Sequence, residues 1–571
     1  MKRKSLAVGI VLFLIGSNFI STIAQDTKKS SSQTTRSNWL YVGGNGPGNY
    51  SKIQDAIDNA SDGDTVFVFN GTYYGYVILN KSINLIGEDK NTTIIIGFFA
   101  YTISIVYDRV NMSGFTIQNG GRLGEGIRID SSYNSFFNNI IDIPNDRIRI
   151  SGSRNIIYDN TIKNTYMYLS GDSNIISGNI ITNNYYGLYL IDSSDNIIYN
   201  NSFFNSGLFI SFDIFRNNIL TNNSVNGKPL VYVYDESNLV LDADVGQIIL
   251  VNCTNITVKN QEIFNTFVGI QIWESNACII SDNIVAGNYY GIWLHGCNNT
   301  INASSIANNY CGISLLGDNN TISANTITNN SDNGIYLYYS DYNNIINNFF
   351  SNNYCSIQLD YGNDFNNIIN NTITNNSNAI VAFSGNSNTN ISDNTIKNNK
   401  EGITLVFGSY NNITQNIIAN NDANGINICD SDYNSIINNN ITDNDNGIYA
   451  LRFDYNTIKG NNITWNNWFG INLNCSYGNI ISGNNFLKNR QGIKLVSSNK
   501  NTILKNNFLK NKRHIFFENS SNIWNNNYWG RPRILPKLIF GIINIQNNKT
   551  SPIFDIDWYP AKKPNNIPEM D

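Results

Sequence analysis

The chain has 571 residues, of which 41% are hydrophobic and 14% are charged, and its formal net charge is −5. The charged fraction is well below that of typical soluble domains, and roughly a fifth of the residues are asparagine. The sequence shows no basic stretch of the kind that nucleic-acid binding requires, so we expect no nucleic-acid partner. A globular chain of this length would divide into several domains, whereas a repeat protein need not.

Residues 1–24 have the features of a signal peptide. An apolar run from Leu6 to Ile15 follows three basic residues and precedes a small-residue cleavage site at Thr22-Ile23-Ala24. An uncleaved membrane anchor is the alternative interpretation. No later apolar run is long enough to span a bilayer, so we predict a secreted or cell-surface protein without an integral span in the mature chain. Residues 25–38 are predicted to form a polar linker.

The segment 39–64 is predicted to be an N-terminal cap that contains one helix. Apolar residues recur at helical spacing over Tyr50–Ala60, and Ser51 is the expected N-cap. We expect this helix to cover the first coil of a solenoid, whose core and strand edge would otherwise meet solvent. Alternating strands are predicted to follow at Thr65–Phe69, Tyr76–Leu79, Ile83–Ile86 and Thr93–Ile96.

Residues 126–267 carry an irregular repeat, which becomes regular from residue 269 onward. The fold prediction rests on the regular part. The irregular part has turn starts near Gly126, Arg147, Tyr166, Gly187, Gly207, Pro229 and Gln247. From Gly269 onward the pattern Gly-Ile-x-Leu, or a close variant, returns every 21 to 23 residues and is followed by two Asn-x-Ile segments. Twelve such repeats begin at Gly269, Gly291, Gly312, Gly334, Ser356, Ala379, Gly402, Gly425, Gly447, Gly470, Gly492 and His514.

Within each regular repeat the apolar residues alternate, which predicts strands rather than helices. The Ile after each start and the apolar residue two positions later are expected to point into a core. Three short strands per repeat predict one coil of a parallel β-helix. A leucine-rich repeat shares this length, but its consensus is absent. We therefore predict an all-β fold with a parallel β-helix over 65–529, in about 22 coils, and a C-terminal cap with a proline-containing tail over 530–571.

Asparagines recur in two columns of the regular repeats. We expect each column to form a ladder along stacked coils, which lie about 4.8 Å apart. Asparagine suits a turn because it tolerates the left-handed conformation and bonds nearby backbone, so we interpret these residues as structural. The two columns are Asn411, Asn434, Asn456, Asn479 and Asn501, and Asn416, Asn439, Asn461, Asn484 and Asn506.

Several motifs give the chain a family resemblance. The segments Tyr41-Val42-Gly43-Gly44, Tyr50-Ser51-x-Ile53-Gln54 and Gly63-Asp64-Thr65-Val66 resemble the opening of NosD-like right-handed β-helix proteins. That family belongs to the pectate-lyase-like group of carbohydrate-binding proteins and sugar hydrolases. Val225-Asn226-Gly227-Lys228-Pro229-Leu230 and Asn527-Tyr528-Trp529-Gly530 resemble its variants on archaeal cell surfaces. The resemblance implies a right-handed coil over nearly the whole mature chain and is specific for fold, not for activity.

The resemblance also implies copper, because founding members are described as copper-associated periplasmic proteins. Copper requires clustered imidazole or sulfur ligands, whereas His295 and His514 lie ten coils apart and the methionines are scattered, so we expect no copper site. Calcium is the better candidate metal. Asp432 and Asp454 share a register on adjacent coils, as do Asp422 and Asp445, and such carboxylate pairs suit Ca²⁺. The alternative, which we favour, is that each Asp caps backbone in its own turn.

Catalysis in the pectate-lyase-like group would need charged groups that converge on the outer face of the coil. The outward His295 and Asp360 stand three coils apart, about 14 Å by strand spacing. We therefore predict no catalytic residues. A polysaccharide lyase, hydrolase or epimerase is the alternative function.

Outward aromatic residues indicate a binding surface instead. Flat exposed rings suit sugar faces, so we expect a carbohydrate-binding strip with polar contacts along its edge. The expected members are Trp273, Trp293, His295, Tyr336, Tyr338, Gln358 and Asp360. A second aromatic column precedes the repeat starts and contains Tyr185, Phe267, Tyr289, Tyr310, Tyr354 and Trp468. The alternative for both sets is stacking between coils.

The sequence thus predicts a non-catalytic protein that binds polysaccharide or cell-envelope glycan, or has a structural role in the envelope. Asn-x-Ser/Thr sequons such as those at Asn70, Asn252 and Asn412 add the expectation that an exported chain carries glycans.

Overall fold

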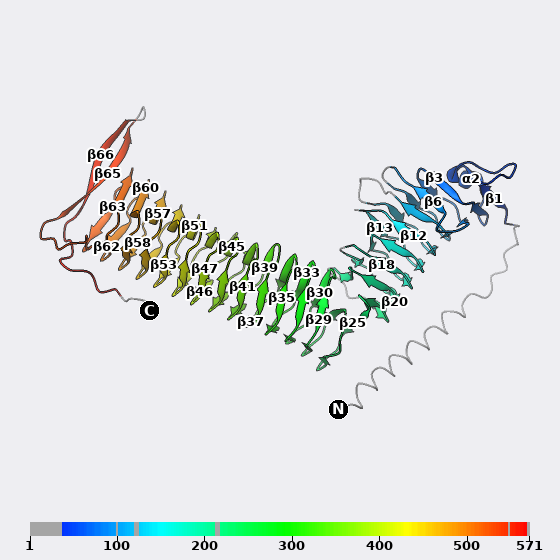
Figure 1. Ribbon diagram of the computed structural model, residues 1–571, viewed down its shortest axis with the longest axis horizontal. Helices are drawn as coiled ribbons and strands as arrows, with labels where there is room; N and C mark the ends of the chain where they lie inside the picture. The colour runs from blue at the N-terminus through cyan, green and yellow to red at the C-terminus, as the bar shows by residue number, and fades with distance from the viewer. Residues whose placement is uncertain are drawn as a thin grey trace.

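The computed structural model describes residues 37–98, 101–118, 125–144, 146–184, 186–211, 217–545 and 549–567. The predicted signal peptide and most of the predicted linker lie outside these residues. The described chain is an all-β parallel solenoid of about 22 coils, which confirms the predicted fold class (Figure 1). No helix among the described residues is long and apolar enough to cross a membrane.

The solenoid consists of two stacks of coils. In the first stack, a nine-stranded sheet runs from β1 (Trp39–Val42) to β23 (Ile219–Thr221), and a seven-stranded sheet runs from β4 (Val77–Leu79) to β22 (Leu208–Ile210). In the second stack, a twelve-stranded sheet runs from β29 (Glu262–Phe264) to β62 (Asn507–Leu509). Figure 1 shows the stacks as two limbs that meet at an angle.

A hairpin joins the two stacks. Strand β24 (Ser224–Val225) pairs in parallel with β21 (Ser202–Phe204) of the first stack and then antiparallel with β25 (Lys228–Tyr234). The turn between them is Asn226-Gly227, and both residues have positive φ, 50° and 80°, as a tight two-residue hairpin requires. Strand β25 then pairs in parallel with β27 (Gln247–Val251) and begins the second stack.

This reversal was missing from the prediction of a continuous β-helix over 65–529. The predicted starts at Arg147 and Tyr166 do begin strands of the first stack, β13 (Arg147–Ile150) and β16 (Tyr166–Leu169). Pro229 and Gln247, which were assigned to the same series, instead lie in β25 and β27 of the second stack. The error arose because an Asn-Gly hairpin interrupts the coil without interrupting the alternation of apolar residues.

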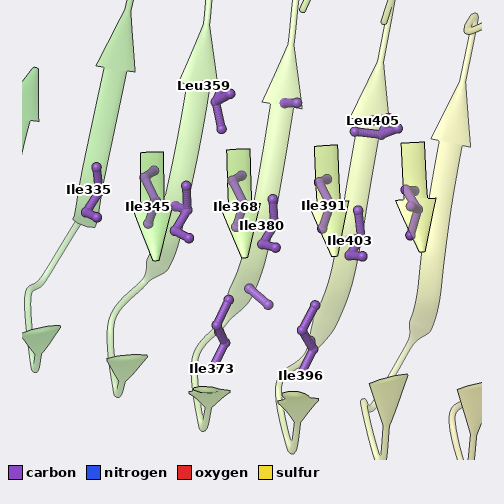
Figure 2. Close-up of a cluster of buried hydrophobic side chains, with 14 of the residues drawn as sticks. Ile335, Ile345, Leu359, Ile368, Ile373, Ile380, Ile391, Ile396, Ile403 and Leu405 are labelled. Atoms are coloured by element: carbon purple, nitrogen blue, oxygen red, sulfur yellow. The ribbon is translucent and has the colours of Figure 1, made fainter. Parts of the chain in front are cut away.

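The regular repeats form the coils of the second stack as predicted. One coil consists of β48 (Glu401–Val406), β49 (Asn412–Thr414) and β50 (Ile417–Ala419). Ile403 is 1% exposed and pairs in register with Ile426 of the next coil. Figure 2 shows isoleucine and leucine side chains from successive coils gathered in one continuous core, which confirms the predicted inward positions.

The two predicted asparagine ladders are present. In one of them the Asn439 side-chain amide donates to Asn461 Oδ1 at 3.0 Å, and the Asn439 backbone N–H donates to the same oxygen at 2.8 Å. The residue before each ladder asparagine, such as Gln415 or Asn438, has the positive φ, whereas the ladder asparagine is buried. The expectation that the ladder residues themselves take the left-handed conformation was therefore wrong. A third buried ladder, not predicted, contains Asn421, Asn444, Asn466, Asn489 and Asn511.

At the N-terminal end, α2 (Ile53–Asn59) packs on β1, β2 (Thr65–Val68) and β4. Its buried face consists of Ile53, Ala56 and Ile57, as the helical spacing predicted. The helix is shorter than expected, and Lys52 rather than Ser51 occupies the N-cap position, without a side-chain capping bond. That this helix protects the first coil remains a prediction.

At the C-terminal end, the region expected to be a cap and loose tail contains an antiparallel hairpin, β65 (Lys537–Ile545) and β66 (Lys549–Asp557). Pro552 lies within β66, opposite Ile542. A proline is tolerated in β66 because the backbone of this strand pairs with β65 along one edge and with the coil at one bridge only, Trp524 to Asp557.

Candidate functional site

The first stack ends on an open strand edge, β22, which the second stack covers with side chains. Gln247 accepts a hydrogen bond from the Leu208 N–H at 3.0 Å and donates to the Leu208 carbonyl at 2.7 Å. Gln271 bonds the N–H and carbonyl of Ile210 in the same way. Trp273 Nε1 donates to the Ile210 carbonyl at 2.7 Å. These side chains take the place of a neighbouring strand, because an unpaired buried edge would be costly.

Three of the predicted sugar-binding residues belong to this joint. Trp273 is 2% exposed, and His295 stands edge-on to its ring at a centroid distance of 4.6 Å. Trp293 is half-buried against Phe209 of β22, at 4.9 Å between ring centroids. The prediction that Trp273 is exposed is therefore wrong, whereas Trp293 and His295 are partly exposed. Their outward direction was assigned correctly, but the first stack contacts Trp273 and Trp293 on that face.

The other four predicted residues do lie together. Strands β39 (Asn333–Tyr338) and β42 (Cys355–Asp360) pair Tyr336 with Gln358 and Tyr338 with Asp360. Gln358 Nε2 donates to Asp360 Oδ2 at 2.8 Å. Burial, and then the charge of Asp360 and a hydrogen bond to it, raise the pKa of Tyr336, so its phenol stays protonated. With Tyr339 and Tyr361, whose rings contact Tyr338, this set forms what we call the tyrosine patch.

A groove of about 680 Å³ lies at the elbow between the stacks, along the turn that follows the third strand of each coil. Both stacks contribute to this elbow groove, and amide side chains dominate its lining. Tyr289 and Tyr310 stack on each other there at 4.5 Å and 10°, and Tyr310 is 43% exposed. The first stack supplies Asn183, Asn184 and Asn205, and the second stack supplies Asn265, Thr266, Gly287, Asn288, Asn308, Asn309, Asn329 and Ser331.

The groove offers hydrogen bonds and ring faces at neutral charge. Burial raises the pKa of Tyr289 to about 12. The nearby Asp332 carboxylate is the main cause of a raised pKa at Tyr310, so both phenols are protonated at neutral pH. The described residues that line the groove include no carboxylate, imidazole, amine or guanidinium. Such a lining suits a neutral ligand that is rich in hydroxyl groups.

The sequence analysis found part of this site. Tyr289 and Tyr310 belong to the second aromatic column, whereas Phe267 of that column is 3% exposed and Tyr185 lies outside the described residues. The first-stack asparagines had no sequence signal, because only the hairpin at β24 and β25 brings Asn183 and Asn205 beside the second stack.

Two known protein families match the part of the chain that forms the coils. The family described as "Right handed beta helix region" matches residues 101–263 and 268–417, more than half of the chain. The chain belongs to the right-handed β-helix family. A second family, "Periplasmic copper-binding protein (NosD)", matches residues 379–537, which lie in the second stack of this β-helix protein. The resemblance to NosD-like β-helix proteins is thereby confirmed.

Solved structures similar to this β-helix protein are distant. The A-module of mannuronan C-5 epimerase AlgE6 from Azotobacter vinelandii is 16% identical, over 69% of this chain and 88% of that one, with a TM-score of 0.21. Pectin methylesterase from carrot is 12% identical over 52% and 83%, with a TM-score of 0.22. Pectin methylesterase from Aspergillus niger is 14% identical over 49% and 87%, also with a TM-score of 0.22. At these scores the likenesses carry no argument about activity. No curated protein matches the chain.

The residues present do not fit the copper that the NosD name implies. Within 379–537 the copper-type side chains are His514, Cys429 and Cys475, on different coils. His514 packs near the Phe508 and Trp529 rings. Across the described part of the chain, no group of three or more His, Cys, Asp or Glu side chains is placed to hold a metal ion.

Three of the four predicted calcium carboxylates already accept a hydrogen bond within the protein. Asp432 Oδ1 accepts the Asp454 N–H at 3.0 Å, and Asp454 Oδ1 accepts the Tyr477 N–H at 2.7 Å. Asp445 Oδ1 accepts a bond from the Asn467 amide at 3.0 Å, and Asp422 is exposed. The carboxylates at Asp432 and Asp454 thus have a structural role, although they cap backbone of the next coil and not of their own turn as expected.

Proposed function

We propose that this β-helix protein is an exported, non-catalytic protein that binds polysaccharide or cell-envelope glycan in the elbow groove. One observation carries the proposal: two stacked tyrosines lie among amide side chains drawn from both stacks. The exposed ring of Tyr310 offers an apolar surface to a sugar ring, and the amides offer paired donors and acceptors to its hydroxyl groups. A glycan in the groove would contact both stacks and so steady the elbow.

The chemistry of the lining supports binding rather than turnover. Cleavage or epimerisation of a glycan needs a general acid or base within hydrogen-bond reach. The only titratable side chains in the described lining of the groove are two phenols with raised pKa values, and the neighbouring Asp332 carboxylate is engaged by the Tyr310 hydroxyl. In the tyrosine patch, Asp360 is engaged by Gln358 and Tyr336. A structural role in the envelope is compatible with this glycan binding.

The proposed location is the cell surface or the medium. The predicted signal peptide over residues 1–24 supports export, and the matched NosD family is described as periplasmic. An exported chain would meet envelope polysaccharide as its natural partner. Sequons such as Asn70 and Asn412 would then be available for glycosylation.

The test is a binding screen of the purified protein on uronan and neutral polysaccharides, followed by titration calorimetry on the best ligand. We expect Tyr310→Ala to weaken binding by about 1–3 kcal/mol, as for loss of one stacking ring. Asn308→Ala should weaken binding by about 1 kcal/mol through loss of a hydrogen bond. The matched control is Tyr433→Ala, an exposed tyrosine that stacks on Tyr410 six repeats after the repeat of Tyr310 and does not line the groove.

Two outcomes would change the proposal. If Tyr310→Ala binds like the wild type while Tyr338→Ala loses binding, the site is the tyrosine patch and not the elbow groove. If new reducing or unsaturated ends appear during incubation with any polysaccharide, and a groove or patch variant abolishes them, the protein is an enzyme.

A further inference from the structure

The hairpin at the C-terminal end presents an apolar face to solvent. One side of it packs on the coil: Ile539 is 4% exposed, and Gly541 lies so close to the Phe517 ring that a side chain would not fit. On the opposite side, the cross-strand pair Phe540 and Phe554 is 58% and 60% exposed. Figure 1 shows the hairpin extending beyond the last coils, at the far end of the second stack from the elbow.

More exposed apolar residues flank the open end of this hairpin. Lys537 pairs with Asp557 at the last register position, so the segments before Lys537 and after Asp557 meet there. The first segment contains Ile534 and Leu535, which are 90% and 76% exposed, and the second contains Trp558 and Tyr559. We call the whole set the terminal patch: Ile534, Leu535, Leu538, Phe540, Phe554, Trp558 and Tyr559. Several large apolar residues exposed at one end of a protein indicate a contact surface.

The acidic side chains of the hairpin point toward the coil, whereas most other charged residues at this end are basic. The two carboxylates of β66 turn inward: Asp555 accepts a bond from Trp524 Nε1 at 2.9 Å, and Asp557 accepts one from Trp529 Nε1 at 3.0 Å. Basic residues dominate the remainder. From residue 488 to the C-terminus the sequence has fourteen Lys and Arg against five Asp and Glu, a net +9, so the preceding 487 residues carry a net −14.

Three of these cations gather beside the terminal patch. Burial, followed by the positive charges of Arg533 and Arg531, lowers the pKa of Lys537, and Arg531 likewise adds to a lowered pKa of Arg533. None of the ion pairs among the described residues involves Arg531, Arg533 or Lys537. The cluster is therefore repulsive within the protein, and an external anionic surface would relieve it.

We propose that the C-terminal end docks on an anionic lipid surface. Isoleucine and leucine side chains that are three-quarters exposed match an acyl boundary and not the polar face of a glycan, while Trp558 and Tyr559 suit the headgroup level. Arg531, Arg533 and Lys537 provide the attraction to anionic headgroups. The protein would bind the membrane peripherally, because the patch is the face of a hairpin and not a membrane span.

This inference goes beyond the proposed glycan binding and does not depend on it. The elbow groove lies about ten coils from the hairpin, roughly 50 Å by strand spacing. Docking through the hairpin would hold one end of the protein at a membrane and leave the groove at a distance from it.

The experiment is co-sedimentation of the full chain with vesicles that contain about one third anionic lipid, compared with neutral phosphatidylcholine vesicles. Two apolar variants, Ile534→Ser/Leu535→Ser and Phe540→Ser/Phe554→Ser, and one charge variant, Arg531→Gln/Arg533→Gln, are compared with wild type. The controls are Phe407→Ser, which is 60% exposed in the middle of the second stack, and Lys397→Gln/Lys400→Gln. All variants share the N-terminal apolar run, so any binding by that run is common to them.

We expect wild type and controls to bind anionic vesicles at low salt, with little binding to neutral vesicles. The apolar and charge variants should bind about ten-fold more weakly or worse. The inference is overturned if wild type does not sediment with anionic vesicles, or if the terminal-patch variants bind as wild type does. It is also overturned if the wild type self-associates in sedimentation velocity through the same residues, or if it binds soluble uronan through them, since a second copy or an acidic glycan would then be the occupant.

Discussion

The two stacks share one architecture but differ in regularity, and the difference appears at the turn after the third strand of each coil. In the second stack this turn holds a ladder of buried asparagines from Asn288 to Asn511. In the first stack the same turn holds Ile143, Thr165, Asn184 and Ser206, which have different sizes and bonding capacities. Identical residues can stack only where successive coils have the same shape, so a regular repeat supports three ladders and an irregular one supports two.

The irregular stack also ends differently. Its last strand, β22, leaves an edge that the regular stack covers with Gln247, Gln271 and Trp273. The elbow and its groove arise from this mismatch, because the first stack continues through a hairpin and not through another coil. The comparison indicates that regular coils provide length and stability, and that the irregular boundary provides the site.

The largest expected effect tests the shared core. Ile403→Asp places a charge in the dry column of the second stack and should lower the free energy of unfolding by about 4 kcal/mol or more. Ile148→Asp is the matched change in the first stack, where the residue is 0% exposed. Urea denaturation followed by circular dichroism would measure both. An unchanged midpoint for Ile403→Asp would contradict the assigned repeat phase.

The second ladder, which both stacks possess, provides a matched pair. Asn179 and Asn439 each donate to a neighbouring asparagine oxygen and to two backbone carbonyls. Changing either to Ala leaves several buried groups without partners and should cost about 3 kcal/mol. Denaturation curves of the two variants should agree closely. A much smaller cost for Asn179→Ala would mean that ladders matter only in the regular stack.

Lowering the pH should affect the stability of the second stack through histidine protonation, because both histidines of the chain lie in that stack. Burial, and then the charges of Lys537 and Arg533, lower the pKa of His514 to about 4 from its ordinary value of 6.5. Between pH 6.5 and 4 the unfolded chain binds more protons, so stability falls as the pH falls through this window. We expect a loss of about 2 kcal/mol, allowing for the partial exposure of the ring.

The measurement is the free energy of unfolding of wild type and His514→Gln at pH 7 and pH 4. The difference between the two proteins should shrink or reverse at pH 4, because only the wild type carries this histidine. An equal pH dependence in both proteins would remove His514 as the cause.

A smaller effect is expected at the joint. Gln247→Ala leaves the N–H and carbonyl of Leu208 without their partners and should cost about 1–2 kcal/mol. Because these bonds connect the stacks, small-angle scattering should also show a more variable elbow angle. Gln358→Ala, which removes a side-chain bond to Asp360 on the same strand, is the control and should change stability by less than about 0.5 kcal/mol. A rigid elbow in Gln247→Ala would show that the bonds from Gln271 and Trp273 to Ile210 suffice to hold the joint.

The smallest expected effect is that of metal. A ligand stabilises a fold only through a site in the native state. Adding Cu²⁺ or Ca²⁺ should therefore leave the thermal midpoint of either stack unchanged. A tight stoichiometric copper titration that stabilised only the second stack, where the NosD match lies, would restore the role in the family's name. Stabilisation by Ca²⁺ that Asp432→Asn abolishes would instead establish the calcium pair.

Much of the fold could be predicted from the sequence, because equivalent positions of the coil recur many times at a fixed spacing. The inward direction of Ile403 and the ladder positions of Asn416 and Asn439 follow from spacing alone, and the structure confirms them. The hairpins at both ends of the second stack could not be predicted in this way. Asn226-Gly227 and Pro552 gave local signals, but each was assigned to the continuing pattern or to a tail.

The predicted carbohydrate-binding strip is found in part, as the tyrosine patch. Tyr336, Tyr338, Gln358 and Asp360 were correctly brought together, since adjacent coils place residues of the same register side by side. Trp273, Trp293 and His295 were placed on the correct face but were expected in solvent. Nothing in the repeat indicates that another part of the chain covers that face.

The sequence by itself determined most of what depends on neighbouring coils: the period, the core, two of the three ladders and the family. These contacts join residues that are about one repeat apart, so the spacing in the chain specifies them. Only the tertiary structure decided where two stacks meet, which aromatic rings are buried there, and which amides from the first stack line the groove. Such contacts, for example between Ile210 and Trp273, join residues that no period relates, and a single turn at Asn226-Gly227 decides whether they form.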